Sequence, residues 1–252
     1  MQEERAKGNG IKSIAFTIFF IVLFASTFSK GIPLMAKLFL YEKVDKEALE
    51  EEKTRVKEEA RKLDPEGKRI VLTDDVLKVE YKDYYATRVD SNNFVLSIIC
   101  ISVYVFVFSA AMMIVASFFF RQKGAVKGAV KWLIILVLIL GGVRLLREIP
   151  FFKLPPKPED VACKLNEVEI LRKDVKTSTS SDDDGTSSTS YTYYIYFDDE
   201  NGKEYKFMVT KDSYDSLKVH DTCYIASATS KDETVYYRKF DLDRLYMLPG
   251  KE

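Results

Sequence analysis

Residues 94–120 read FVLSIICISVYVFVFSAAMMIVASFFF, and this stretch decides the fold. Every residue in it is uncharged, although Asp, Glu, Lys and Arg make up 30% of the chain. A helix needs about 20 apolar residues to cross the bilayer core, so the stretch can span with some tilt. Arg121 and Lys123 follow it directly, as expected where a helix leaves the membrane. We therefore predict a transmembrane helix here.

A second apolar run lies near the N-terminus, at residues 14–29, and it carries no charge. Three basic residues precede it, namely Arg5, Lys7 and Lys12. This is the layout of a signal peptide or a signal anchor. Because the run is long and no clear cleavage site follows it, we expect an uncleaved anchor, with Pro33 ending or kinking the helix.

A third run, residues 132–143, is wholly uncharged but short. It can cross the bilayer only if Lys131 and Arg144 extend their charged ends toward the interfaces. The alternative is an interfacial or re-entrant segment. Spanning is the preferred interpretation, so the sequence predicts three transmembrane helices in all.

Residues 121–131 connect the apolar runs 94–120 and 132–143. This connection is basic and contains no acid. Its charged residues are Arg121, Lys123, Lys127 and Lys131. Cytoplasmic loops concentrate Lys and Arg in this way, and such residues can contact anionic lipid head groups. A cytoplasmic loop places the N-terminus in the cytoplasm and the C-terminal domain outside it. If the third run does not span, the C-terminal domain is cytoplasmic instead.

Residues 42–93 lie between the apolar runs 14–29 and 94–120. They begin with a charged helix over 42–63 that lacks Gly and Pro. Its few apolar residues fall at helical spacing and form a thin stripe. A solvated helix and a partner-binding helix both fit this pattern. The sequence Asp64-Pro65-Glu66-Gly67 then ends the helix. Two short strand-like pieces follow, at residues 69–72 and 76–81.

A Pro-rich linker, residues 150–160, leads into the C-terminal domain, residues 161–252. Apolar residues in that domain alternate with period two, which is typical of strands. The alternation changes phase near Asn166, which suggests a bulge, and Asn201-Gly202 predicts a hairpin turn. Five short strands suggest a small β-barrel of OB or SH3 type, since closure removes exposed edges.

Residues 176–190, KTSTSSDDDGTSSTS, are of low complexity. We expect a flexible hairpin loop here. The run Asp182-Asp183-Asp184-Gly185 lacks the alternating ligands and terminal Glu of an EF-hand, so a solvated loop is favoured over a calcium site.

Residues 214–221, YDSLKVHD, resemble a turn of the form Tyr-x-x-Leu-x-Val-Gly-Asp. That turn occurs in small β-barrel domains tethered to bacterial membrane helices, including NfeD-like proteins. The resemblance covers roughly thirty to forty residues and implies a binding or assembly module, with no catalytic residue to transfer. His220 stands where the family has Gly, which puts the tight turn in question.

The chemically active residues form no recognisable site. The chain has one histidine, His220, and three cysteines in no metal-binding spacing. No Gly-x-Ser-x-Gly elbow is present, so we expect no catalysis, cofactor or metal. Cys163 and Cys223 could form a disulfide if the domain lies outside the cytoplasm. Two unpaired, buried thiols are the alternative.

Together these features predict an α+β membrane protein with three transmembrane helices and a small C-terminal β-barrel. Its domains are 1–41, 42–93, 94–149, the linker 150–160, and 161–252. Lys plus Arg and Asp plus Glu both number 38, which argues against nucleic-acid binding. We expect a membrane-anchored binding or scaffolding protein that contacts a protein partner or itself, and no enzyme. A small oligomeric transport or channel component is the alternative.

Overall fold

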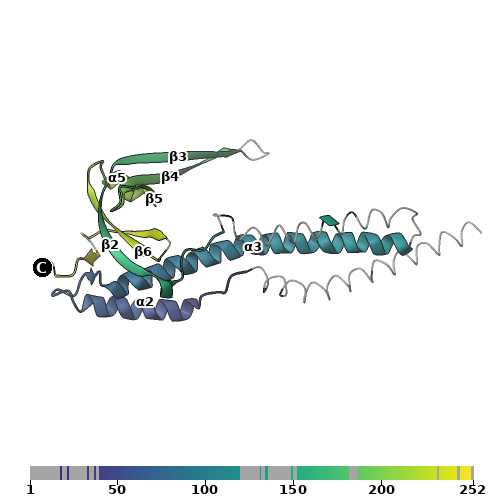
Figure 1. Ribbon diagram of the computed structural model, residues 1–252, viewed down its shortest axis with the longest axis horizontal. Coiled ribbons are helices and arrows are strands. Elements are labelled where there is room, and N and C mark those ends of the chain that lie inside the picture. The colour runs from purple at the N-terminus through teal and green to yellow at the C-terminus, as the bar shows by residue number, and fades with distance from the viewer. Residues whose placement is uncertain are drawn as a thin grey trace, which may run out of the picture. The chain divides into compact units, whose positions relative to one another are not determined.

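The computed structural model describes residues 40–119, 152–181, 187–231, 233–242 and 245–250, together with positions 18, 22, 33, 37, 131, 134, 135 and 149 (Figure 1). The chain divides into two compact units. The first unit consists of Met1–Lys43 and Arg88–Leu154, and the second of Val44–Thr87 and Pro155–Glu252. The second unit thus combines residues 44–87 with the predicted C-terminal domain, residues 161–252.

Helix α2 (Lys46–Arg61) is the predicted charged helix. It begins where the Asp45 carboxylate accepts hydrogen bonds from the backbone N–H groups of Glu47 and Ala48, at 3.1 and 3.2 Å. A side-chain acceptor at this position satisfies N–H groups that have no partner within the helix. Only three α2 residues are buried, namely Leu49, Val56 and Ala60. They are part of the predicted apolar stripe, and they belong to the core of the second unit.

The turn after α2 is organised by the buried side chain of Asp64. Its carboxylate accepts backbone hydrogen bonds from Lys68 at 2.8 Å and Arg69 at 2.7 Å. Gly67 adopts a left-handed conformation with φ 66°, which suits a residue without Cβ. The turn leads into β1 (Ile70–Val71), which pairs in parallel with β8 (Tyr246–Met247).

Helix α3 (Asp74–Phe119) has 46 residues, equivalent to about 69 Å at 1.5 Å per residue. Residues 76–81, predicted as a strand, are helical and belong to it. The apparent alternation arises because α3 is covered on several sides here. Val76, Val79 and Tyr81 are each at most 1% exposed. A helix buried all round loses the one-sided pattern that usually identifies it.

The predicted set of three transmembrane helices is wrong for the part of the chain that the structure describes. Within that part, only α3 is long and apolar enough to cross a membrane, judged by length and composition over Asp74–Ser109. The first and third predicted spans lie outside the described residues, apart from isolated positions. A charge-free run is necessary for a span but does not make one, and residues 132–143 are fewer than the roughly 20 that a helix requires.

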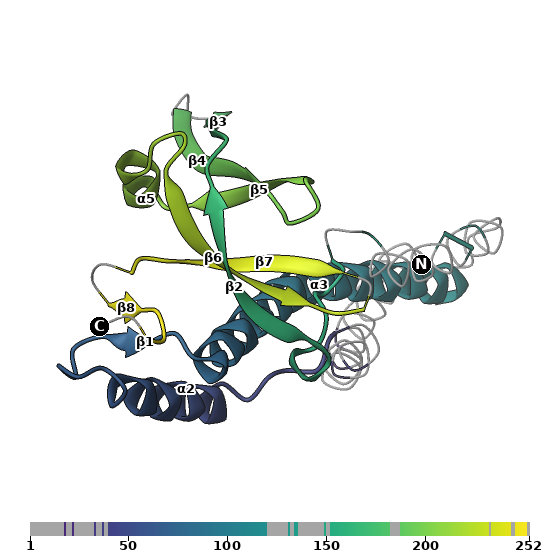
Figure 2. The ribbon, with the colours of Figure 1, turned by 60° about the vertical axis from the view of Figure 1, so that its left-hand side comes forward.

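The C-terminal strands form two open three-stranded antiparallel sheets, so the predicted barrel is also wrong (Figure 2). The first sheet has the order β2-β6-β7, with β2 at Ala162–Glu169, β6 at Thr222–Thr229 and β7 at Thr234–Phe240. The second has the order β3-β4-β5, with β3 at Arg172–Ser181, β4 at Ser187–Asp198 and β5 at Glu204–Val209. A 3-10 helix η2 (Pro158–Asp160) precedes β2, and the short helix α5 (Lys211–Ser216) follows β5.

The strands do not close because the first sheet is covered on both faces. In β6, Cys223 and Ile225 pack into a core with the second sheet. Ala226 and Ala228 pack into the other core, with α2 and α3. A sheet with two apolar faces forms the middle of three layers, whereas a small barrel buries one face of each strand.

The same two-sided burial explains the phase change seen in β2. Cys163 and Leu165 pack against the helical core, while Val168 packs in the core shared with the second sheet. The register between β2 and β6 is continuous past Asn166, so the predicted bulge is absent there. The register shift lies instead between β6 and β7, where Tyr237 is the extra residue. It turns toward α3, and its hydroxyl donates to the Leu77 carbonyl at 2.7 Å.

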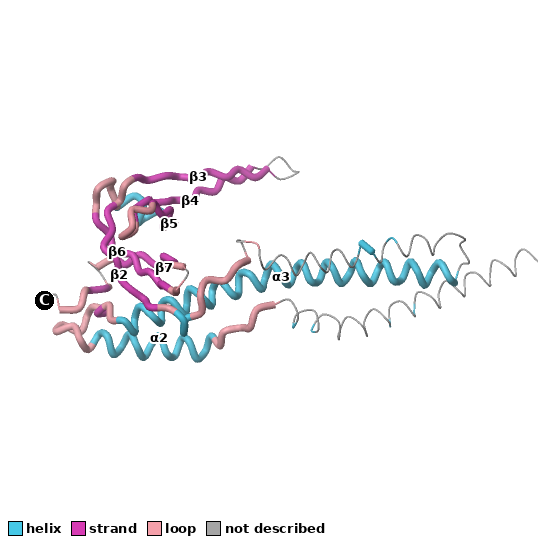
Figure 3. Tube along the Cα trace, in the orientation of Figure 1, coloured by secondary structure: helices cyan, strands magenta, loops and turns pink. Residues whose placement is uncertain are grey.

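Most of the predicted flexible loop 176–190 is regular structure (Figure 3). Ser181 pairs with Ser187 at the end of a continuous ladder between β3 and β4. Alternating threonines have good strand propensity, and backbone pairing needs no apolar core. Composition alone therefore overestimated the length of the loop.

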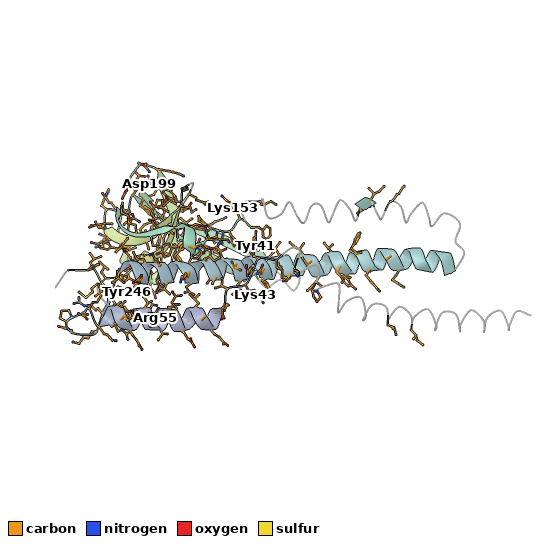
Figure 4. All side chains as sticks on the ribbon, turned by 60° about the horizontal axis from the view of Figure 1, so that its bottom comes forward. Tyr41, Lys43, Arg55, Lys153, Asp199 and Tyr246 are labelled. Atoms are coloured by element: carbon orange, nitrogen blue, oxygen red, sulfur yellow. The ribbon has the colours of Figure 1, made fainter. Side chains whose placement is uncertain are left out.

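A buried carboxylate joins the helices to the middle sheet. Glu80 on α3 has a side chain with 0% exposure, and Lys57 Nζ of α2 lies 2.6 Å from its Oε1. Its other oxygen accepts a hydrogen bond from Arg238 of β7. Figure 4 shows how the side chains of α2 and α3 fill the space between these two helices.

Replacing Glu80 with Ala should destabilise the second unit by about 3 kcal/mol, because Lys57 and Arg238 then stay partly buried without their common partner. The measurement is urea unfolding of the full chain in detergent, followed by near-UV circular dichroism. Glu59→Ala is the matched control on α2. Glu59 pairs with Arg55 in an exposed position, so its loss should cost about 0.5 kcal/mol or less. Equal effects of the two substitutions would contradict the assignment.

The buried Asp64 carboxyl predicts a loss of stability in acid. Backbone hydrogen bonds, that from Arg69 foremost, hold the pKa of Asp64 below its ordinary value of 3.8. Because the pKa is lower in the folded state, the ionised carboxyl stabilises the fold above pH 3.8. This contribution disappears as the pH falls through the lowered pKa. The difference in urea midpoint between the wild type and Asp64→Asn should therefore shrink below about pH 4. A difference that is constant down to pH 2.5 would refute this role.

Candidate functional site

The outer face of the second sheet is the most distinctive surface of the second unit. The inner residues of β4 and β5 fill the core, and among them are Ile195 and Phe197. Residues on the opposite face pair across the strands, with Arg172 and Lys206 both opposite Tyr196, and Met208 opposite Tyr194. This outer face combines aromatic rings with charged groups from all three strands.

Two cations cover the tyrosines of this face. The Arg172 guanidinium lies 3.5 Å from the ring centre of Tyr196, and Lys206 Nζ lies 3.9 Å from that of Tyr194. Cations over aromatic faces are attracted by the ring quadrupole. Tyr196 is only 7% exposed as a result, although it points away from the core.

A paired carboxylate fixes the arginine in this position. Arg172 donates two hydrogen bonds to Glu204, at 2.7 and 3.2 Å. This contact lowers the pKa of Glu204 and raises that of Arg172. A hydrogen bond with Tyr196 likewise raises the pKa of Lys206. Both cations therefore keep their charge, and the face presents fixed donors beside exposed apolar area at Met208, which is 64% exposed.

The β3–β4 hairpin extends beyond the rest of its sheet (Figure 1). β5 pairs only with residues 193–198 of β4, so residues 187–192 have β3 as their single neighbour among the described strands. β3 itself pairs only with β4 over its whole length. The two-stranded ribbon formed by residues 177–181 and 187–192 contains Ser, Thr and Tyr191 and nothing else. Natural edge strands usually carry Lys, Pro or a bulge that prevents pairing with other chains.

The base of the ribbon is anchored by Lys173. Its ammonium donates to the Leu217 carbonyl at 2.6 Å and to the carbonyl of Tyr214. It also lies 4.0 Å from the Tyr214 ring centre. These contacts fix α5 against the inner side of β3 and β4, so the ribbon projects from a rigid support.

A pocket of about 330 Å³ lies elsewhere in the second unit, between α2, α3 and η2. It is lined by Val44, Asp45, Ala48, Leu49, Glu52, Lys82, Tyr85, Pro158 and Glu159. Its charged groups are already engaged, since Lys82 lies 2.6 Å from Glu52 and Asp45 caps α2. The pocket therefore presents apolar surface with neutralised charge, and it lacks a distinctive polar group for a ligand.

The first unit contains a cluster of amide and carbonyl groups at the start of the apolar stretch. The Asn93 side chain exchanges hydrogen bonds with the backbone of Tyr41, at 2.8 and 3.0 Å. The Asn92 amide and the Tyr41 hydroxyl both donate to the Phe152 carbonyl at 2.8 Å. Both asparagines are buried, and they tie three distant segments of the chain together where α3 becomes apolar.

Cys163 and Cys223 are free thiols and form no disulfide. Cys223 lies opposite Val168, five residues from Cys163 along β2. This corresponds to roughly 16 Å, far beyond the Cα separation that a disulfide spans. Burial raises the pKa of Cys163, and that of Cys223 to about 11. Cys223 is buried, whereas Cys163 is only partly buried.

The basic loop falls largely outside the described residues. Arg121, Lys123 and Lys127 are among the residues not described, while Lys131 is helical and exposed.

His220 adopts a left-handed conformation, with φ 73°, that non-glycine residues seldom adopt. The backbone N–H of His220 donates to the Ile170 carbonyl at 2.8 Å, and its ring lies 2.7 Å from Glu169.

Comparison with known proteins gives no relative: no family model, no curated protein and no solved structure matches the chain. Among the described residues, no group of three or more His, Cys, Asp or Glu is placed to hold a metal ion. The candidate site therefore has to be judged from its own geometry.

The features of the outer face that depend on strand pairing could not be recognised from the sequence. Tyr194, Tyr196 and Lys206 lie at strand positions that face away from the core. The alternation of inward and outward residues in these strands could be recognised in the sequence. Their partner Arg172 comes from another strand, which no spacing in the sequence shows. Asn92 and Asn93 were visible as the last polar pair before the apolar stretch.

Proposed function

We propose that this chain is a membrane-anchored binding protein whose second unit presents the β3-β4-β5 sheet to a protein partner. The observation that carries the proposal is the continuity of α3. Its first part is the core of the folded unit, with Glu80 and Tyr81 buried, and its later part is uncharged from residue 94 onward. Helix α3 thus contains both part of the core of the folded unit and the apolar stretch.

The exposed surface of α3 supports an apolar environment. Phe94, Ile98, Ile101 and Val105 are 42–69% exposed and fall at helical spacing. Leu96, Cys100 and Val103 are buried and lie on the opposite face. A soluble protein rarely exposes such a stripe to water, whereas lipid is the natural solvent for it.

The second unit is built from two separate segments of the chain, which favours the same side of the membrane for both. Residues 44–87 and 155–252 share one core, so the chain between them must begin and end at the same membrane face. This supports a multi-pass protein and disfavours a C-terminal domain separated from residues 44–87. The basic residues 121–131 follow the other end of α3, and by the positive-inside rule that end lies in the cytoplasm. The second unit then lies outside the cytoplasm.

Labelling of an added cysteine tests this orientation. Lys231 is exposed in the β6–β7 turn, and Lys231→Cys should react with a membrane-impermeant maleimide on intact cells. The wild type is the control, because burial raises the pKa of Cys163 and Cys223, the latter to about 11. Cys223 then carries about a hundredfold less thiolate than a thiol of pKa 9 at neutral pH. Reaction of Lys231→Cys only after cell lysis would reverse the orientation.

Photo-crosslinking tests the binding surface. A photoreactive amino acid at Met208, on the outer face of β5, should give an adduct of one defined mass in native membranes. Leu63 is the matched control, since it is 61% exposed against 64% for Met208 but lies in the turn after α2. Adducts at both positions, or at neither, would contradict a binding role for the sheet.

A further inference from the structure

The free edge of β3 has a charge pattern that divides it into two halves. Residues 172–176 carry Arg172, Lys173, Asp174 and Lys176, and residues 177–181 are exclusively Ser and Thr. The side chains of residues 176–180 are exposed. The edge has no Pro and no bulge against β4, because its ladder runs without a shift from Arg172 to Ser181. It is therefore geometrically ready to accept another strand.

We propose that β3 pairs antiparallel with β3 of a second copy of this chain, about a two-fold axis at Thr177. The pairing joins the two three-stranded sheets into one continuous sheet. This proposal rests on the proposed function, since it names one way in which the β3-β4-β5 sheet makes protein contacts.

Symmetry fixes the possible registers. A two-fold axis perpendicular to the sheet makes the strands antiparallel and keeps the same face upward in both copies. Side chains on one face must then meet side chains on the same face. Moving the axis by one residue along β3 therefore shifts the partner of every residue by two positions. A single strand position consequently lies on the axis and faces itself.

Charge and ladder length together select Thr177 for that position, because among the axes that avoid like-charge pairs it pairs the longest part of β3, residues 173–181 of each copy. With Thr177 on the axis, Lys176 of each copy lies opposite Ser178, and Asp174 lies opposite Ser180. Every charged residue among these pairs thus faces a hydroxyl. An axis at Lys176 would place two lysines directly opposite each other, which is destabilising. Parallel pairing in register would do the same for Lys176 and also for Asp174.

The choice of a second copy follows from this self-complementarity. An unrelated strand would need a charge pattern matched to Arg172–Lys176, whereas the Ser/Thr half of β3 already accommodates the charged half. Thr–Thr and Ser–Thr pairs also stabilise antiparallel neighbours. The rigid base of the ribbon at Lys173 limits the conformational entropy that pairing would cost.

The test introduces a positive or a negative charge at Thr177 of the full chain. Self-association in detergent is then measured by sedimentation over a concentration series. Thr177→Lys and Thr177→Glu should each weaken the dimer about tenfold, because like charges then meet on the axis. An equimolar mixture of the two variants should recover the wild-type affinity, since Lys then faces Glu. Recovery also shows that both variants remain folded.

Thr189→Lys is the matched control, because Thr189 pairs with Thr179 on the same hairpin but belongs to β4. It should leave the dimer unchanged. A monomeric wild type, a Thr177→Lys dimer of wild-type affinity, a mixture that does not recover, or a dimer lost only in Thr189→Lys would each overturn the proposal. A Met208 adduct that persists in any of these cases would show that partner binding stands while self-pairing fails.

Discussion

The burial of Glu80 is the interaction on which the second unit depends. One carboxylate on α3 receives Lys57 from α2 and Arg238 from β7, so the helix pair and the middle sheet must assemble together. A buried charge is tolerated only when it is paired, and each of these partners comes from a different part of the chain. The three elements therefore form one core.

The two-faced middle sheet follows from the same assembly. Because α2 and α3 cover one face of β2-β6-β7, the other face needs a second cover, which β3-β4-β5 provides. That outer sheet then has only one face to bury. Its other face carries Tyr194, Tyr196 and their cations, and its β3 edge stays unpaired among the described residues. The surfaces proposed for protein contact are thus those that the core does not bury.

Helices and turns could be predicted from the sequence where residues close together along the chain determine the local structure. The charged helix, its end at Asp64 and the turn at Gly202 all follow from capping and turn residues. The strand prediction at residues 76–81 failed because burial on several sides removes helical periodicity. The predicted bulge failed because β2 changes the core that it packs against, and a change of face has the same pattern as an inserted residue.

The sequence by itself determined that residues 94–120 are long and apolar enough to cross a membrane, that a charged helix precedes them, and that a strand-rich region follows. These properties depend on composition and short-range spacing, which are printed in the chain. Only the tertiary structure decided that residues 44–87 and 155–252 share one core, that the sheets stay open, and that Cys163 and Cys223 lie apart. Contacts between residues more than a hundred positions apart, such as Tyr237 with Leu77, depend on how whole elements pack, and no local pattern specifies them.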